Sequence, residues 1–517
     1  MPLPARKKKS KNILDCVPST AEVPLGWVTS GGIWKINVSP SETTTPEEEG
    51  DEEEEGKENA SNQHQNIFRS LFLMRITLKV MGTIPMHYNK ATGTYEFRWL
   101  TFSAMHTCVI FAWFNILLVT TGIGLGRLFT ECDFLGKSTS HEIELLTVII
   151  IVGCLLNAWV EIFYLLCHRN SFCSYLDEWQ AIARRTGLDP AKGLRRSTSI
   201  LAIFLYTFIV LVLIASAFGG DTLVGVEDAL AKVFLLIPEE WLKRDIFSMT
   251  VLRLMVGILI GHLYVVYKGA LFVFVTACHV LYNVFHQWKE ELNKTMDFIW
   301  RMDKKESAVC SAITATVAAA IGVEVGENNQ ASEGHCVGMA ELVENHWTIV
   351  KMVRFTEKLF APTLQCFYST QVVTLCLELY LVAYRMSLGE QYQAEELAWQ
   401  TIIIAQTFIV FFLVSMKASY VYEEASSSVD ILRRGLPYSA SDKDKFHFKE
   451  LVTSVTGSPI CITGGGFFYI NRPFIITVIG AVVSYFIIIL QLMLPSVQDK
   501  AQNESRSNNM SLSTAII

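Results

Sequence analysis

Seven long apolar runs constrain this 517-residue chain more than any other feature of its sequence. A helix needs about 20 apolar residues to cross about 30 Å of hydrocarbon, and each run is of about that length or longer. The runs hold almost no interior proline, and a segment in lipid must satisfy its own backbone hydrogen bonds, so we predict helices rather than strands. The predicted spans are 100–123, 145–167, 198–219, 255–281, 359–384, 399–420 and 474–495.

The composition agrees with a seven-helix, all-α integral membrane protein. The chain is 51% hydrophobic and 18% charged, whereas soluble proteins carry about 25% charged residues. A net charge of -7 gives no sign of nucleic-acid binding. The twelve cysteines form no CxxC pair, and several lie inside apolar runs, as Cys154 and Cys278 do, so they are expected to pack as small hydrophobic side chains. We expect no metal, no cofactor and no catalytic site.

The segment before the first span divides into two parts. Residues 1–62 contain a basic start and the acidic run Glu47 to Glu58, which predicts a disordered cytosolic tail because like charges repel. No apolar core follows the basic start, so we expect no secretory signal. Residues 63–99 are predicted to be a membrane-interfacial helical segment, because basic residues alternate with Leu and Phe over 66–86. Pro85 is expected to end that helix.

Two further segments are predicted to lie outside the membrane. Residues 282–358 are expected to form a long cytosolic loop, and residues 496–517 a short extracellular tail. Residues 307–323 are apolar but consist mainly of Ala, Ser and Thr, which gain little from lipid, so we place them in that loop. If they span the membrane, the predicted topology changes.

Lys and Arg residues in the loops predict the orientation, because cytoplasmic loops carry an excess of both. The loop after the first span has two, Arg127 and Lys137. The loop after the second span has six, namely Arg169, Arg184, Arg185, Lys192, Arg195 and Arg196. The loops after the fourth and sixth spans are also rich in them. We therefore expect the N-terminus in the cytosol and the C-terminus outside, the reverse of a G-protein-coupled receptor.

The last predicted span carries a polar–apolar–polar face. Ser484 and Gln491 are two helical turns apart, and Ile487 and Ile488 lie between them. Polar groups inside a span usually face protein or water. This face is therefore a candidate pore lining in which the isoleucines close the path by excluding water. The alternative is that Ser484 and Gln491 bond to neighbouring helices.

The same helix carries a family resemblance. Ser484-Tyr485, five further residues and Gln491-Leu492 resemble the T-Y-x5-Q-F signature in the last helix of arthropod gustatory receptors. The chain departs from it mildly, with Ser for Thr and Leu for Phe. The lead-in to the helix, Gly466-Phe467-Phe468 with Asn471-Arg472, also resembles that family. The resemblance covers about residues 66–495.

The resemblance implies a ligand-gated, non-selective cation channel, a chemoreceptor in the plasma membrane of sensory neurons that serves taste. Four like or unlike subunits would surround a pore that the last helix lines, and a tastant would bind an outward-facing pocket in each. On this resemblance Ser484, Ile487, Ile488 and Gln491 line the pore, and Tyr485 packs against a neighbour. Phe467, Phe468 and Arg472 would belong to a cytosolic anchor that joins subunits.

Candidate pocket residues follow from the predicted topology. Gln371, Thr374 and Glu378 form one polar stripe in the outer half of the fifth span. The other candidates are His262, Tyr264, Lys268, Trp399 and Gln406. Lys268 and Glu378 are predicted to pair, because an isolated charge in the membrane is costly. Each has a structural alternative, such as snorkelling for Lys268 or the interfacial aromatic belt for Trp399. Trp159 and Glu161 fall in the inner half of their span and are left out.

Other functions remain as alternatives. The FFYINR lead-in slightly resembles sugar-responsive gustatory receptors, while carbon-dioxide-type members share parts of it, and a bitter-type member is also open. A G-protein-coupled chemoreceptor would have its N-terminus outside. A secondary transporter would show two similar halves, which the sequence lacks. A membrane enzyme would need clustered His or acidic ligands, whereas the histidines here are scattered.

Overall fold

The computed structural model describes most of the chain between residues 76 and 491. The described residues are 86–89, 94–131, 139–189, 193–218, 233–234, 249–319, 337–388, 394–457 and 459–491, with single residues at 76, 79, 82 and 236. By its contacts the chain divides into Met1–Glu55 and Gly56–Ile517, and all described residues belong to the second unit. The predicted tails 1–62 and 496–517 lie outside them.

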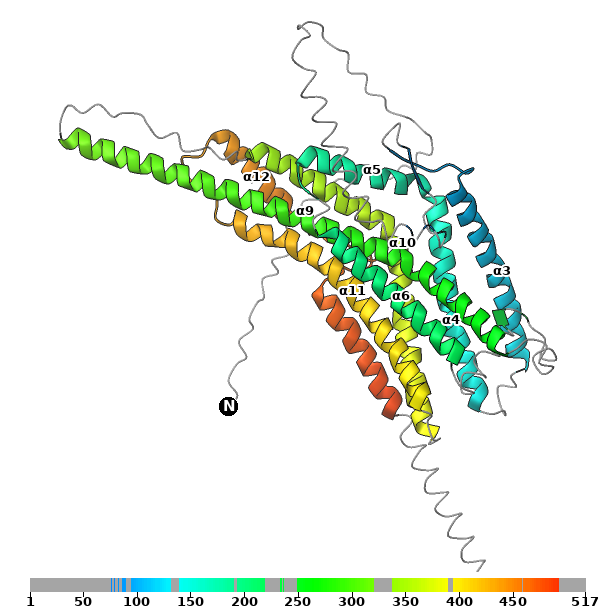
Figure 1. Ribbon diagram of the computed structural model, residues 1–517. Coiled ribbons are helices and arrows are strands. Elements are labelled where there is room, and N and C mark those ends of the chain that lie inside the picture. The colour runs from blue at the N-terminus through cyan, green and yellow to red at the C-terminus, as the bar shows by residue number, and fades with distance from the viewer. Residues whose placement is uncertain are drawn as a thin grey trace, which may run out of the picture. The chain divides into compact units, whose positions relative to one another are not determined.

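The described part is almost entirely helical. The helices are α3 (Phe102–Glu131), α4 (Thr139–Cys167), α5 (Arg169–Thr186), α6 (Leu194–Phe218), α9 (Met249–Ala319), α10 (Met339–Leu388), α11 (Ala394–Leu432), α12 (Asp442–Gly457) and the last helix (Arg472–Gln491). Seven of them are long and apolar enough to cross a membrane, all except α5 and α12. This confirms the predicted all-α membrane class. Successive spans run in opposite directions (Figure 1).

Helix α9 lies at the centre of the packing. It contacts α4, α6, α10 and α11. Its buried side chains include Leu271, Phe274 and Phe285, which belong to one continuous apolar core. A helix that is apolar on most of its faces is expected to be surrounded by others, and α9 is the most buried of the seven spans.

The long loop predicted over 282–358 is wrong for most of its described length. Helix α9 continues to Ala319 and α10 starts at Met339, so 307–319 are helical as well. The physical reason is an apolar stripe at i, i+4 and i+8, formed by the buried Trp288, Leu292 and Met296. The Trp288 Nε1 donates to the backbone oxygen of Leu342 at 3.0 Å, which fixes this extension against α10.

The helical segment predicted over 63–99 is wrong in its second half. Ile76 and Lys79 are helical, but β1 (His87–Asn89) and β2 (Thr94–Glu96) form an antiparallel hairpin in which His87 pairs with Glu96. Asn89 Nδ2 donates to the Glu96 carboxylate at 2.9 Å across it. The Tyr95 N–H donates to Asp177 Oδ1 at 2.9 Å, so the hairpin is tied to α5.

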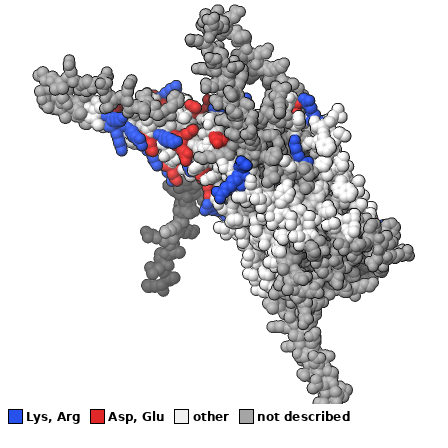
Figure 2. Space-filling view, in the orientation of Figure 1, with Lys and Arg blue, Asp and Glu red and all other residues white. Residues whose placement is uncertain are grey.

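Charged residues gather at one end of the described structure. Figure 2 shows most of the visible Lys, Arg, Asp and Glu side chains along the upper end of the described structure, which includes the second half of α9, and a mostly uncharged described surface below it. Ion pairs cross that end, such as Arg434 with Asp297 at 3.2 Å and Lys351 with Glu178 at 3.4 Å. A charge-free band beside a charged end is the surface expected of helices that are embedded in lipid and emerge into water.

Candidate functional site

A buried amide joins three of the spans. Gln371 of α10 accepts hydrogen bonds from Lys268 Nζ at 3.3 Å and from the Tyr267 hydroxyl at 3.5 Å, both on α9. Its Nε2 donates to the backbone oxygen of Thr407 on α11 at 3.1 Å. Gln371 is only 2% exposed. A satisfied polar network in low-dielectric surroundings holds its helices in one arrangement.

The predicted direct pair between Lys268 and Glu378 does not form. The Lys268 ammonium lies 3.9 Å from the centre of the Tyr267 ring and donates to the neutral Gln371, while Thr407 Oγ1 donates to Glu378 Oε1 at 3.5 Å. Lys268 remains within electrostatic reach of Glu378. The other carboxylate oxygen of Glu378 has no hydrogen-bond partner among the described residues. The amide oxygen of Gln371, and not the Glu378 carboxylate, is therefore the hydrogen-bond acceptor of Lys268 Nζ.

The other residues predicted to bind a ligand have different surroundings. Gln406 Nε2 donates to the Tyr264 hydroxyl, and the Tyr264 ring lies 4.1 Å from the Phe208 ring. Thr374 is buried on the same face as Gln371 and Glu378. The Trp399 side chain lies outside the described residues. The polar candidates of α9, α10 and α11 are therefore buried between helices, and most of them bond to one another.

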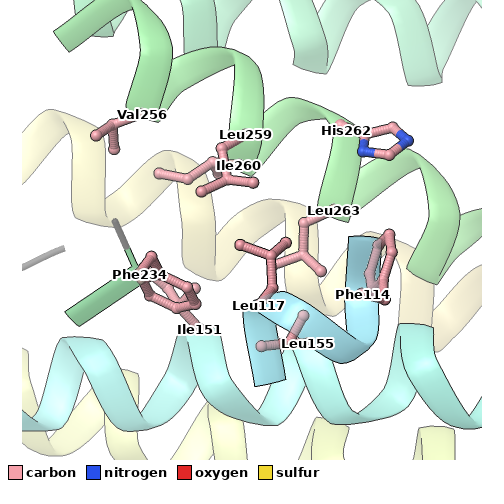
Figure 3. Close-up of a pocket in the computed structure, with 10 residues that line it drawn as sticks. All are labelled: Phe114, Leu117, Ile151, Leu155, Phe234, Val256, Leu259, Ile260, His262 and Leu263. Atoms are coloured by element: carbon pink, nitrogen blue, oxygen red, sulfur yellow. The ribbon is translucent and has the colours of Figure 1, made fainter. Parts of the chain in front are cut away.

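A small apolar pocket lies elsewhere, between α3, α4 and α9 (Figure 3). Nine of its ten lining residues are apolar, and the tenth is His262. The lining consists of Phe114, Leu117, Ile151, Leu155, Phe234, Val256, Leu259, Ile260, His262 and Leu263. Of the predicted ligand residues, His262 alone lines this pocket. The cavity has a volume of about 10 Å³, enough for about one water molecule.

Sequence reasoning missed two polar residues of α4. Asn157 and Glu161 are both at least nine-tenths buried, and Asn157 Nδ2 and Glu161 Oε2 have no hydrogen-bond partner among the described residues. Glu161 lies within electrostatic reach of Lys268. The signal was available, because a carboxylate inside a span is a functional hypothesis by default.

The last helix is the least covered of the seven spans. Its buried side chains, Ile475, Val482 and Ile489, recur every seven residues and face the protein's own core. The four predicted pore residues, Ser484, Ile487, Ile488 and Gln491, are all exposed, with Ile488 54% exposed. Tyr485 is exposed too. No described part of the same chain therefore covers the predicted pore-lining residues.

A tight turn leads into this helix. Gly465 and Gly466 have φ of 66° and 81°, a region that glycine enters without steric cost. The Gly464 N–H donates to the Phe468 oxygen at 2.9 Å, and Thr463 pairs with Tyr469. Asn471 Oδ1 then accepts from the Phe474 N–H at 3.0 Å. This is an N-cap, so the FFYINRP segment has a local structural reason as well as a family resemblance.

The three predicted anchor residues have different surroundings. Arg472 forms a two-pronged ion pair with Glu423 of α11. The Phe468 ring stacks on Phe474 at 4.6 Å and meets the Tyr368 ring edge-on at 5.4 Å. Phe467 is 78% exposed. Arg472 and Phe468 thus fasten the last helix to other helices of the same chain, whereas the Phe467 side chain projects from the surface.

Comparison with known proteins points in one direction. A family model described as 7tm chemosensory receptor matches residues 71–493. The structure is similar to that of the insect olfactory receptor OR5 from Machilis hrabei, with a TM-score of 0.56 and 13% identity over 84% of this chain and 100% of that chain. For OR5 in complex with eugenol the TM-score is 0.57, at 14% identity and the same coverage. Among curated protein sequences none matches.

Proposed function

The chain belongs to the 7tm chemosensory receptor family, and we propose that it is a ligand-gated, non-selective cation channel of the gustatory type. A tastant binds within the helix bundle, the helices shift, and the last helices of neighbouring subunits move apart to admit cations. Binding opens the path only if the ligand prefers the open arrangement. The protein then acts in the plasma membrane of sensory neurons, with its N-terminus in the cytosol.

The observation that carries the proposal is the uncovered polar–apolar–polar face of the last helix. Ser484 and Gln491 are exposed on either side of Ile487 and Ile488. Facing lipid, a serine and a glutamine would each be a cost. Facing three other copies around a common axis, they meet water and ions, and the isoleucines form the constriction. One helix cannot enclose a path, so this function requires several subunits, and we propose a homotetramer or heterotetramer.

Contacts at the base of the last helix support coupling to the bundle. Arg472 is paired with Glu423 of α11, and the Thr463 hydroxyl donates to Glu357 of α10. The Gln371 network joins these same two helices to α9. A rearrangement of α9, α10 and α11 is therefore transmitted to the start of the pore helix through polar contacts as well as through packing.

The test is expression in a cell line that lacks heterotrimeric G-protein signalling, with currents recorded against a panel of tastants that includes sugars. We expect ligand-evoked cation currents. We also expect Gln491→Ala to change the relative permeability to Na⁺ and Ca²⁺ while surface expression stays unchanged. The matched control is Phe486→Leu, a half-buried position on another side of the same helix.

Two results would contradict the channel. A ligand response that appears only when G proteins are restored would indicate a G-protein-coupled receptor instead. Equal selectivity in wild type, Gln491→Ala and the control would remove the last helix from the pore.

A further inference from the structure

We infer that the pocket between α3, α4 and α9 binds a small, mostly apolar molecule with a single hydroxyl group, and that His262 recognises that group. The inference rests on the proposed function and specifies its ligand. It also moves the ligand away from sugars, because nine of the ten residues that line this pocket are apolar.

The lining decides the class of ligand. Leu117, Leu155 and Leu263 meet from three helices, and Phe114 and Phe234 add aromatic surface. Apolar pockets with few polar groups bind apolar ligands and use the polar groups to orient them. A sugar would bury many hydroxyl groups against this lining, and each one without a partner costs about 1–3 kcal/mol.

Two of the buried polar candidates already have partners on neighbouring helices. Gln371 bonds to Lys268, Tyr267 and Thr407, and Gln406 bonds to Tyr264. These groups hold α9, α10 and α11 together. A ligand that recruited them would first have to break bonds that are buried between the helices.

His262 is the one polar residue among the described residues that line this pocket. Its ring lies 5.8 Å from the Phe114 ring at one end of the pocket (Figure 3). No described residue forms a hydrogen bond with either of its ring nitrogens. A neutral imidazole offers one donor and one acceptor, and a hydroxyl both donates and accepts, so the two match. A ring on the ligand can stack on Phe114 at the same time.

Because the pocket is small, a ligand that binds there must displace helices. Its free space is that of about one water molecule, so a ligand of six to ten heavy atoms must separate α4 from α9 to enter. Helix α9 also carries Tyr267 and Lys268, which bond to Gln371. A displacement of α9 therefore strains the hydrogen bonds of Gln371, which join α9 to α10 and α11.

The experiment uses three probes on the full-length channel: benzyl alcohol, toluene, which lacks the hydroxyl, and sucrose. We expect benzyl alcohol to evoke currents at a concentration at least threefold lower than toluene, and sucrose to evoke none. His262→Phe should raise the half-maximal concentration of benzyl alcohol about three- to tenfold, the effect of one neutral hydrogen bond, and leave that of toluene within twofold. Leu155→Phe, which fills the pocket, should weaken both.

Gln406→Leu is the matched control, because it removes a buried polar group outside the pocket. It should not discriminate between benzyl alcohol and toluene. The inference is overturned if His262→Phe affects the two probes equally, or if sucrose opens the channel with a sensitivity that His262→Phe changes.

Binding is measured separately on the purified protein, since a ligand that binds the folded state raises the midpoint of thermal unfolding. A saturable rise with benzyl alcohol that is lost in His262→Phe supports the pocket even where no current flows, so that missing currents count against the channel alone. No saturable rise in the wild-type protein overturns the pocket.

Discussion

Gln371 shows how one residue determines the arrangement of several helices. It accepts from an ammonium and a hydroxyl on α9 and donates to a backbone oxygen on α11. Lys268 has no carboxylate within ion-pair distance among the described residues, so the amide oxygen is its main acceptor. A buried ammonium is costly in lipid unless it is solvated by such groups.

We predict that Gln371→Leu destabilises the protein by about 2–3 kcal/mol, because a hydrogen bond to a buried charged group is lost. The midpoint of thermal unfolding in detergent measures this. The double variant Lys268→Met/Gln371→Leu should recover part of the loss, since no buried charge remains. If the double variant loses the sum of the two single effects, the two residues do not interact.

At this scale the sequence predicted burial well and partners poorly. The spacing of Gln371, Thr374 and Glu378 correctly indicated one interior stripe. The spacing of polar residues along one helix does not show which residues of the neighbouring helices face them. The predicted pairing of Lys268 with Glu378 was therefore wrong, and the hydrogen bond from Thr407 to Glu378 was not predicted. His262 was found as a polar residue in a span, but the nine apolar residues that line the pocket with it come from four separate segments that only the fold brings together.

The helices and strands also differ in whether local sequence or tertiary contacts determine them. The seven spans were predictable, because hydropathy and length decide them. The extensions of α9 and α10 beyond the apolar runs were not, since there the helix is stabilised by packing of Trp288 against α10 rather than by lipid. The hairpin at 87–96 depends likewise on Asp177 of α5, which lies 82 residues after Tyr95.

The turn before the last helix is an element whose geometry requires glycine at Gly464. A Cβ at this position would lie 2.1 Å from the Phe468 ring, which is itself held against Phe474 and Tyr368. We predict that Gly464→Ala lowers stability by about 1–3 kcal/mol, the usual cost of overpacking, and reduces surface expression. Gly457→Ala, where a Cβ meets nothing within 4 Å, should change neither. Similar expression of the two variants would contradict the predicted clash.

The ion pair between Arg472 and Glu423 tests coupling between elements. Both side chains are partly exposed, so Arg472→Ala should cost less than about 1 kcal/mol of stability. Because this pair joins α11 to the start of the last helix, we expect the variant to shift the half-maximal agonist concentration without loss of surface protein. The swapped variant Arg472→Glu/Glu423→Arg should move it back toward wild type. A shift that the swap leaves unchanged would show that the contact does not carry the coupling.

For the whole molecule, the number of crossings and the charged end together determine the topology. Because seven is an odd number, we expect seven crossings to put the start of the first span and the end of the last span on opposite sides of the membrane. The charged extensions of α9, α10 and α11 lie at the end where α4 finishes and the last helix begins (Figures 1 and 2). From the excess of Lys and Arg in the loops we predict that this is the cytosolic end.

Cys167 at the end of α4 makes that orientation measurable. Its side chain is exposed, whereas Cys173 nearby is buried, and burial together with the charges of Asp177 and Glu96 raises the pKa of the Cys173 thiol to about 11. A thiolate is the reactive form, so at pH 7.4 a maleimide should modify Cys167 and spare Cys173. With a membrane-impermeant maleimide, peptide mass spectrometry should find Cys167 modified only after the cells are permeabilised. An epitope after Ile517 should be stained on intact cells, and an epitope before Met1 should not. Modification of Cys167 on intact cells would reverse the orientation, and with it the side from which a ligand reaches the pocket.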